Sequence, residues 1–268
     1  MMSELRAEPR ALPPGTILQR IYVRKRLQGL RPGRFVHVGT GEGSLSRVLL
    51  DLGWTGSGWD LNESALERAR ALTKPYIEAK RYELRHGDWL ASDPGPPSDL
   101  VVSEMLLEHL DEEAEHHYFE RAVAELATDG LGILLVPGSQ RHWGIEDEVA
   151  GHRRRYTRES LRRAVESAGC RVERLVGLTW PLSNVLLPIS NRLVRRAEAQ
   201  RLSLNLQRRT IASGHRNVPW KTRFPPVARL VLNEWALRPF HLAQLAGSKR
   251  ESALILYCEF RNGSTGGG

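Results

Sequence analysis

The sequence predicts an α/β fold in which helices cover both faces of a doubly wound, mostly parallel sheet of seven strands. Three observations support this prediction. Short apolar strands alternate with amphipathic helices between residues 35 and 180, a glycine-rich turn follows the first strand, and acidic residues follow the next strands. About 70 residues that fit no repeating unit separate the last two strands, so a helical insertion is expected before the last strand.

Apolar periodicity and capping residues define the individual elements. Thr157 as N-cap and Gly169 just past the end delimit the last regular helix, and Asp129-Gly130 is expected to stop the helix before it. The predicted strands comprise residues 35–38, 58–60, 82–85, 99–103, 131–136, 171–178 and 253–260. The predicted helices comprise residues 16–30, 44–52, 62–72, 111–127 and 157–168. The chain is thus divided into an N-terminal lead-in and helix (1–30), a core (31–180), the insertion (181–252), the final strand (253–262) and a flexible tail (263–268).

Length and composition exclude several classes of protein. With 268 residues, 41% of them hydrophobic, the chain can bury a sizeable core and is not expected to be disordered. It has no run of about 18 uncharged apolar residues, and its first residues are charged, so neither a membrane span nor a secretory leader is expected. Cys170 and Cys258 are too few for a disulfide scaffold or a zinc site. A reduced cytoplasm is the expected compartment, possible contact with a membrane surface being left open.

Basic residues gather in one part of the chain. The net charge is +8, and residues 181–251 alone hold 13 Arg and Lys against 3 Glu, so the rest of the chain is close to neutral. This basic insertion is suited to an acidic partner: a phosphorylated substrate, an acidic carrier protein or an anionic membrane surface. A solvated, arginine-rich exterior is the alternative interpretation. No oligomeric state is predicted.

A glycine-rich turn, Gly39-Thr40-Gly41-Glu42-Gly43, follows the first strand and precedes a helix. Glycines there let the backbone turn tightly and approach a bound molecule closely. Position 44 is serine, so the third glycine of a dinucleotide-binding fingerprint is missing, and no Gly-Lys-Ser/Thr of a phosphate-binding loop follows. Taken alone, the turn also fits a purely structural role.

Acidic residues follow three further strands, at Asp60, Asp88 and Glu104. Asp60 lies 21 positions after Gly39, where a carboxylate can accept both hydroxyls of a ribose. Asp88 can accept an adenine amino group, and the adjacent Trp89 offers a ring to the adenine face. Each acid alone also fits the capping of a following helix. Together with the glycine turn, they favour a nucleoside site at the carboxyl ends of the strands.

With these motifs in place, the sequence resembles the class I S-adenosylmethionine-dependent methyltransferases, in particular the small-molecule branch that includes quinone-biosynthesis enzymes. The matching stretches are residues 35–43, 58–66, 86–89, 98–110 and 130–138, and together they cover roughly residues 30–180. The resemblance implies a Rossmann-like fold with S-adenosyl-L-methionine as cofactor and S-adenosyl-L-homocysteine as product. It implies methyl transfer to an oxygen, nitrogen or carbon atom of a small molecule: a secondary metabolite, or a lipid-linked or carrier-bound compound.

The resemblance also assigns cofactor-binding positions, beneath a covering N-terminal helix. The family usually has an acid two residues before the first glycine, near the cofactor's ammonium group, and this chain has His37 there; Glu42 is a candidate to compensate. The implied positions are His37, Gly39, Thr40, Gly41 and Gly43 at the methionine end, Asp60 and Leu61 at the ribose, Asp88 and Trp89 at the adenine, and Ser103 and Glu104 after the fourth strand.

A second motif, Gly151-His-Arg-Arg-Arg-Tyr156, precedes the Thr157 helix and resembles a substrate-side motif of bacterial methyltransferases. The candidate catalytic residues are His152, Asp147, Tyr156 and His109, and the candidate substrate-binding residues are Trp143, Arg154 and Trp180. Alternatively, the arginines at 153–155 pair with the acids at 146–148 as a structural loop. No metal site is predicted, because His116 and His117 fall on the polar side of an exposed helix.

The insertion is expected to form a lid over the substrate pocket. A different class of function, a nucleic-acid-binding protein or an RNA methyltransferase, would use its basic charge. The fourth strand is followed by Ser103-Glu104-Met105-Leu106, however, and not by the Asn/Asp-Pro-Pro-aromatic run of base amino-methylases, so nucleic acid is not the expected partner. A cofactor-binding protein without catalytic activity is the third alternative.

Overall fold

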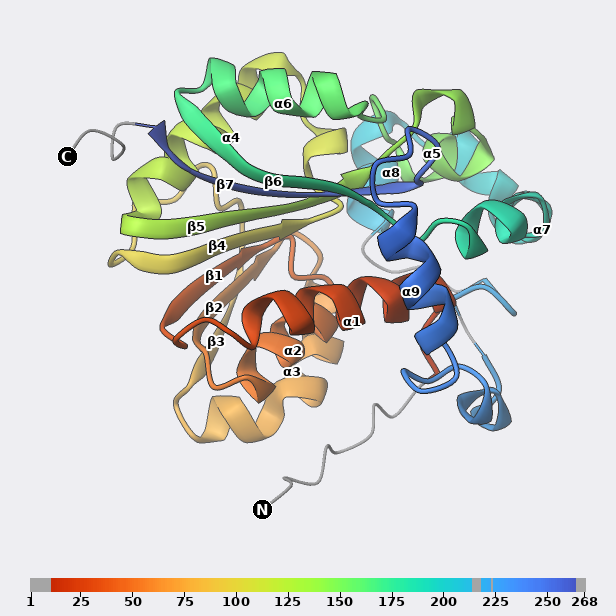
Figure 1. The fold of residues 1–268 in the computed structure, drawn as a ribbon, viewed down its shortest axis with the longest axis horizontal. Helices are drawn as coiled ribbons and strands as arrows, with labels where there is room; N and C mark the ends of the chain where they lie inside the picture. Colours follow the sequence, from red (N-terminus) through yellow and green to blue (C-terminus); the bar gives the residue numbers. More distant parts are fainter. Residues whose placement is uncertain (1–10, 214–217, 223, 264–268) are drawn as a thin grey trace.

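A seven-stranded sheet with helices on both faces forms the centre of the molecule (Figure 1). The computed structural model describes residues 11–213, 218–222 and 224–263, so residues 264–268 of the predicted tail lie outside the described residues. The strands are β1 (Arg34–Val38), β2 (Thr55–Asp60), β3 (Tyr82–His86), β4 (Ser98–Glu104), β5 (Leu126–Pro137), β6 (Cys170–Leu178) and β7 (Ile255–Asn262). The α-helices are α1 (Pro14–Leu27), α2 (Ser44–Asp51), α3 (Glu63–Glu78), α4 (Glu112–Glu125), α5 (Ile145–Ala150), α6 (Arg158–Ser167), α7 (Leu182–Glu198), α8 (Leu206–Ser213) and α9 (Arg238–Ala246).

The strand order is β3-β2-β1-β4-β5-β7-β6, and β7 alone runs antiparallel to its neighbours. The prediction of a mostly parallel, doubly wound sheet is therefore confirmed. After β1 the chain builds the sheet outward through β2 and β3, and it then returns to the other side of β1 with β4. Val38 and Ser103 lie opposite each other in the β1–β4 pair. Ligands of such sheets bind where the strand order reverses, which here is at the carboxyl ends of β1 and β4.

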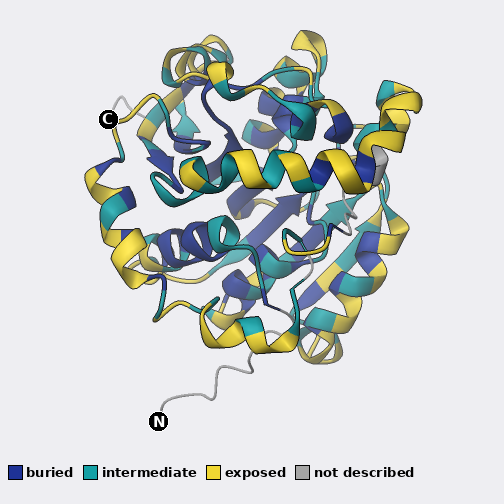
Figure 2. Ribbon diagram, turned by 90° about the vertical axis from the view of Figure 1, so that its right-hand side faces the viewer, coloured by how far each residue is buried: buried dark blue, intermediate teal, exposed yellow. Residues whose placement is uncertain are grey.

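Two hydrophobic layers hold the helices against the sheet. On one face α4 and α6 pack through side chains such as Phe119 and Leu161. On the other face α1 and α2 contribute Leu27 and Leu49, with side chains of α3 packed at the edge. Figure 2 shows this arrangement as buried strands between helices whose outer sides are exposed.

Capping signals fix the helix ends where the sequence indicates them. Thr157 Oγ1 accepts a hydrogen bond from the Ser160 amide at 3.0 Å, and Gly169, just after α6, has a φ of +74°. Asp111 Oδ1 likewise accepts from the Ala114 amide at 3.0 Å at the start of α4. The predicted N-cap of α6 is thus confirmed.

The structure differs from the sequence prediction in several places, and the helix predicted over residues 62–72 extends to Glu78. Helix α4 ends at Glu125, and Asp129-Gly130 lies inside β5, because Leu126 already pairs with Ser98 of β4 and regular pairing continues from Leu131 after a register shift. Pro188 lies within the 17 residues of α7, although a proline inside a helix removes one backbone hydrogen bond. The short helix α5 was not predicted. Every helix among the described residues is too short or too polar to cross a bilayer.

Candidate active site

One cavity of about 1720 Å³ opens along the carboxyl ends of β1, β2 and β4. Its wall includes Gly41 after β1, Asp60 at the end of β2 and Glu104 at the end of β4. Residues 11–16 and Arg20, at the start of α1, also line it, as do parts of the insertion. Pockets for small ligands commonly measure about 300–1,000 Å³. The cavity therefore has room for a nucleoside cofactor and a second molecule.

The glycine turn forms the wall next to β1. Gly39, Gly41 and Gly43 all have positive φ angles, from +54° to +80°, which favour glycine. Gly39 and Gly41 line the cavity. Gly43 instead faces α3, where an added Cβ would lie 3.0 Å from Ala69 Cβ. Its lack of a side chain serves the packing of α2 on α3, and among the described residues it is not part of the cavity wall.

Asp60 ties the glycine turn to the end of β2. Its Oδ2 accepts a hydrogen bond from the Gly41 amide at 2.7 Å, and its Oδ1 accepts from the Asn62 amide at 2.8 Å. Burial raises the pKa of Asp60, while the two backbone amides favour its ionised form and limit that rise. Leu61 and Asp88 line the same part of the cavity. The sequence-predicted ribose and adenine positions are therefore brought together.

His37 lies beneath the glycine turn and is not one of the described residues that line the cavity. It is completely buried, and its Nδ1 lies 2.7 Å from Ser46 Oγ and 3.2 Å from Thr40 Oγ1. Burial lowers the pKa of His37 to about 4, so the ring is neutral. Thr40 itself lines the cavity. His37 thus supports the turn from below, and the acids that line the cavity beside the turn are Glu42, Asp60 and Glu104.

Arg20 of α1 is a cavity residue that sequence reasoning missed. Its Nη2 lies 2.9 Å from Glu104 Oε2 and 2.6 Å from Ser44 Oγ. Its Nε and Nη1 are buried and have no hydrogen-bond partner among the described residues. An arginine in an N-terminal helix carries no sequence signal for such a role, because only the packing of α1 brings it to the turn. The Arg20 guanidinium at the cavity wall is thus ion-paired with Glu104, while two of its nitrogens have no hydrogen-bond partner among the described residues.

His152 also lines the cavity and is held by a buried carboxylate. Its Nδ1 lies 2.8 Å from Asp147 Oδ1, while Arg155 Nε donates to the same oxygen at 2.8 Å and the Gly144 amide donates to Oδ2 at 2.9 Å. Burial alone would raise the pKa of Asp147, but the hydrogen bond from His152 and the charge of Arg155 outweigh it and lower that pKa. Helix α5 presents Asp147 to His152. The carboxylate thereby fixes the orientation of the imidazole.

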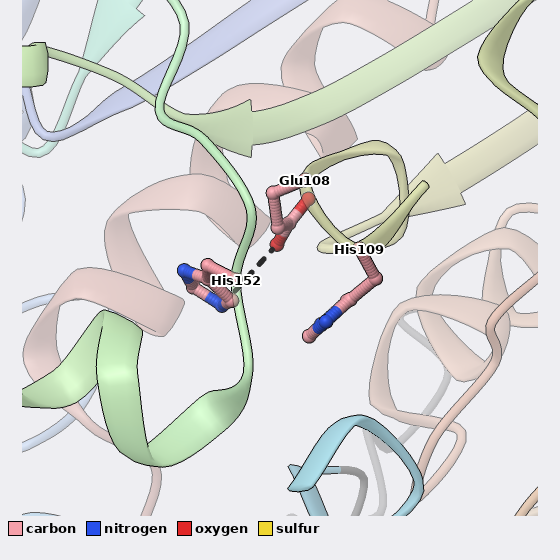
Figure 3. Close-up of side chains that lie close together, drawn as sticks. All are labelled: Glu108, His109 and His152. Atoms are coloured by element: carbon pink, nitrogen blue, oxygen red, sulfur yellow. Dashed lines mark ion pairs between the residues drawn. The ribbon is translucent and has the colours of Figure 1, made fainter. Parts of the chain in front are cut away.

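Glu108 and His109, in a short 3₁₀ turn after β4, lie beside His152 (Figure 3). His109 Nδ1 lies 3.2 Å from the carbonyl oxygen of Gly151, and burial lowers the pKa of His109 to about 4. Both histidines line the cavity. Glu108 is fully buried, with Oε1 at 3.8 Å from His152 Nε2. It was not predicted as a site residue, although it belongs to the Leu-Glu-His-Leu run that carries the resemblance.

Three predicted residues are buried within the core. Trp89 forms part of the cavity wall but is only 2% exposed, with the Arg121 guanidinium 4.6 Å from its ring centroid. Its ring therefore has little face left for an adenine. Ser103 Oγ accepts from Tyr118 at 3.0 Å. Tyr156 donates to the Leu107 carbonyl at 3.2 Å. Among the described wall residues, neither Ser103 nor Tyr156 reaches the cavity.

The three predicted substrate residues also lie away from the cavity wall that the structure describes. Trp143 is partly exposed, and Arg154 donates to the Leu110 carbonyl at 2.9 Å. Trp180 lies beneath the Arg250 guanidinium, 4.3 Å from the ring centroid. The alternative interpretation was a structural loop in which the arginines at 153–155 pair with the acids at 146–148. It is confirmed in part, because Arg155 pairs with Asp147.

The insertion supplies an apolar part of the cavity wall. Helix α7 contributes Leu186, Leu187 and Leu193, and the segment after α8 contributes Trp220 and Phe224. All five of these residues belong to the insertion. The insertion is thus part of the same cavity as the glycine turn.

Comparison with known proteins identifies the family. The family model described as a methyltransferase domain matches residues 16–175, which is more than half of the chain. Similar solved structures include mitomycin 7-O-methyltransferase (TM-score 0.50, 19% identity, covering 61% of this chain and 50% of that one). Another is magnesium protoporphyrin IX methyltransferase of Synechocystis PCC 6803 with bound S-adenosylhomocysteine (TM-score 0.51, 19% identity, covering 62% and 78%).

At such identities these likenesses show the fold alone. The chain spans half the length of the mitomycin enzyme, and no curated protein matches the sequence. The family match covers α1, the glycine turn, Asp60, Glu104, the histidine pair and the strands that place them. The chain therefore belongs to the S-adenosylmethionine-dependent methyltransferases of the methyltransferase-domain family.

Proposed function

We propose that the chain transfers a methyl group from S-adenosylmethionine to an oxygen, nitrogen or carbon atom of a small-molecule acceptor. One observation carries the proposal: a single cavity of about 1720 Å³ joins the glycine turn and Asp60 to the histidine pair and to the apolar wall of the insertion. Cofactor and acceptor can therefore lie in one cavity. Placing the two reactants in line supplies much of the rate of such a reaction.

The residues on the cofactor side fit S-adenosylmethionine. The buried nitrogens of Arg20 that lack a partner among the described residues suit the carboxylate of the methionine part. Asp60 keeps further acceptor capacity beside its two backbone hydrogen bonds and suits the ribose hydroxyls. Gly41 lets the backbone approach the ligand closely. When bound, the cofactor supplies a methyl group on a sulfonium, whose sulfur keeps the electron pair as the carbon–sulfur bond breaks.

The histidine wall is the acceptor side of the proposed reaction. His109 Nδ1 faces a carbonyl oxygen, which can only accept, so this nitrogen carries the hydrogen and Nε2 carries the electron pair. His152 Nδ1 faces the Asp147 carboxylate in the same way. His109 thus keeps an Nε2 electron pair for the O–H or N–H group of an acceptor, and Asp147 prevents the His152 ring from turning.

The insertion is proposed as a lid for a lipid-linked or carrier-bound acceptor. Between the cavity residues Pro226 and Leu232 lie strongly exposed apolar side chains, with Leu230 77% exposed, and Trp235 just beyond is 83% exposed. Exposed apolar side chains of this size suit contact with a lipid or a partner protein. Arg229 and Arg238 beside them suit an anionic headgroup or an acidic carrier.

Methyl transfer from labelled S-adenosylmethionine tests the proposal. Extracts of the source organism are separated into small metabolites, lipids, proteins and RNA, and each fraction is incubated with the protein. Label is expected in the metabolite or lipid fraction, or on a carrier protein, and its incorporation should disappear with the Gly41→Val variant. Incorporation into RNA alone would show that the basic insertion serves a nucleic-acid substrate instead and would contradict the proposal.

A further inference from the structure

Glu108, His109 and His152 form a cluster at the cavity wall that the proposed function uses only in part. One oxygen of Glu108 and one ring nitrogen of each histidine all lie within 4.8 Å of one another. Figure 3 shows the Glu108 carboxylate directed at the His152 ring, with His109 beside them. The two imidazole rings meet edge to face, with their centroids 4.9 Å apart. Two elements distant in sequence, the turn after β4 and the segment after α5, build this cluster.

The hydrogen bonds around the two histidines prepare both rings as ligands. Gly151 O engages Nδ1 of His109, and Asp147 engages Nδ1 of His152, which leaves Nε2 of each ring as the nitrogen that can bind an ion. Metal-binding histidines almost always donate their other N–H to a carbonyl or a carboxylate, which fixes the ring and raises its basicity. Asp147 is in turn held by Arg155 and by the Gly144 amide, so the supporting shell is itself anchored.

The surroundings of Glu108 give a second, independent indication of a metal ion. It is completely buried, and neither of its carboxylate oxygens meets a donor of another described residue. A buried carboxylate without hydrogen bonds is costly and calls for a proton or a cation beside it.

We propose that Glu108, His109 and His152 bind one divalent transition-metal ion at the cavity wall. Two imidazoles and one carboxylate are the donor set of several catalytic zinc sites and of non-haem iron sites, and they leave coordination positions open. Ligand atoms around one such ion lie roughly 3 to 3.5 Å apart, given bonds of about 2.1 Å. His152 Nε2 and Glu108 Oε1, 3.8 Å apart, are close to that spacing, and all the ligand atoms lie within 4.8 Å of one another, so the side chains would move closer together around an ion. The proposal departs from the sequence-based expectation of no metal site.

The inference rests on the proposed function and specifies its acceptor. Open positions on the ion would take up an oxygen of the acceptor, so the acceptor is a hydroxyl compound. The bound ion lowers the pKa of that hydroxyl, so its proton passes to solvent water as the new carbon–oxygen bond forms and the carbon–sulfur bond of the cofactor breaks. When the ion is bound, the two Nε2 atoms coordinate the ion, and the ion contacts the acceptor instead of the histidines.

Binding of ZnCl₂ and CoCl₂ to the metal-stripped full chain tests the proposal. Calorimetry gives the stoichiometry and affinity, and the visible spectrum of Co²⁺ reports its ligands without any need for activity. Glu108→Gln and His109→Gln each remove one ligand with little change in side-chain size. The matched controls are Glu113→Gln and His117→Gln on the exposed side of α4, since the cluster of His116, His117 and Glu120 is the obvious adventitious site.

One ion per chain is expected, with affinity at least about tenfold weaker in Glu108→Gln and His109→Gln and unchanged in the two controls. Binding that Glu108→Gln leaves unchanged, or that His117→Gln abolishes, would overturn the proposal. Calorimetry with S-adenosylhomocysteine on the same samples separates the two claims. If the nucleoside binds and the metal does not, the metal site fails and the proposed function stands. If the metal binds and the nucleoside does not, the proposed function fails.

Discussion

Replacing Asp60 with alanine is expected to weaken cofactor binding more than any other change to a single cavity carboxylate. In the free protein this side chain accepts amide hydrogen bonds from Gly41 at 2.7 Å and Asn62 at 2.8 Å. Its removal deprives the ribose of an ionised acceptor and frees Gly41, whose φ of +54° the carboxylate helps to hold. Two effects on the same ligand therefore follow from one substitution.

The size of the effect follows from the bonds that are lost. A hydrogen bond to a charged group contributes about 1.5–3 kcal/mol. Two hydroxyls on one carboxylate, taken at the lower value, contribute about 3 kcal/mol, or roughly 100-fold in Kd. Asp60→Asn keeps one acceptor oxygen and loses the charge, so it is expected to fall between the wild type and Asp60→Ala.

Isothermal calorimetry with S-adenosylhomocysteine measures this change. Asp93→Ala, at an exposed carboxylate in the loop after β3, is the control and should bind like the wild type. Thermal unfolding followed by circular dichroism establishes that each variant is folded. A folded Asp60→Ala protein whose Kd lies within about threefold of the wild type would refute the assignment of Asp60 to the cofactor.

Three further predictions concern other residues. Gly41→Val should remove S-adenosylhomocysteine binding in calorimetry, because the added side chain occupies open space at the cavity wall and the positive φ disfavours valine. The protein should stay folded, since no atom lies within 4 Å of the added Cβ; retained affinity would contradict this prediction. His152→Ala should slow turnover by about 10²-fold or more and leave that affinity within twofold, and an unchanged rate of labelled-methyl transfer would remove His152 from the acceptor wall. His37 has a folded-state pKa of about 4, below the ordinary 6.5, so the unfolded chain takes up the proton first and stability falls as the pH drops from about 6.5 to 4, by up to about 3 kcal/mol. Urea unfolding of His37→Gln across this range should show a shallower decline, since only the other histidines with lowered pKa values, His109, His142 and His241, then contribute in this way, and an equally steep decline would exclude His37 as a source.

Local signals in the sequence predict the fold and half of the site. The alternation of strands and helices gives the sheet, and Thr157 gives the start of α6, because capping depends on neighbouring residues only. Gly41 and Asp60 also follow from the sequence, since both lie at strand ends that a parallel sheet must bring to one edge. In each case the structural consequence depends on a few adjacent positions.

The remaining features depend on packing between distant segments. Arg20 reaches Glu104 only because α1 lies over the end of the sheet. Glu108 gains its importance from His152, 44 positions later in the chain, and no spacing rule joins the two. Trp89 was expected to face an adenine, but Arg121 of α4 covers its ring.

The position of His37 in the structure also differs from the sequence prediction. Its position suggested a contact with the cofactor, whereas the structure turns the side chain toward Ser46 and away from the cavity. A single residue type at a motif position does not reveal which way the side chain points when a hydrogen-bond partner on the following helix competes for it.

A crystal structure of the protein with S-adenosylhomocysteine tests the central claim most directly. The ribose is expected against Asp60, the methionine carboxylate against Arg20, and the sulfur directed toward His109 and His152. Density for the nucleoside at any other place on the molecule, or none at saturating concentration, would contradict the assignment of this cavity to methyl transfer.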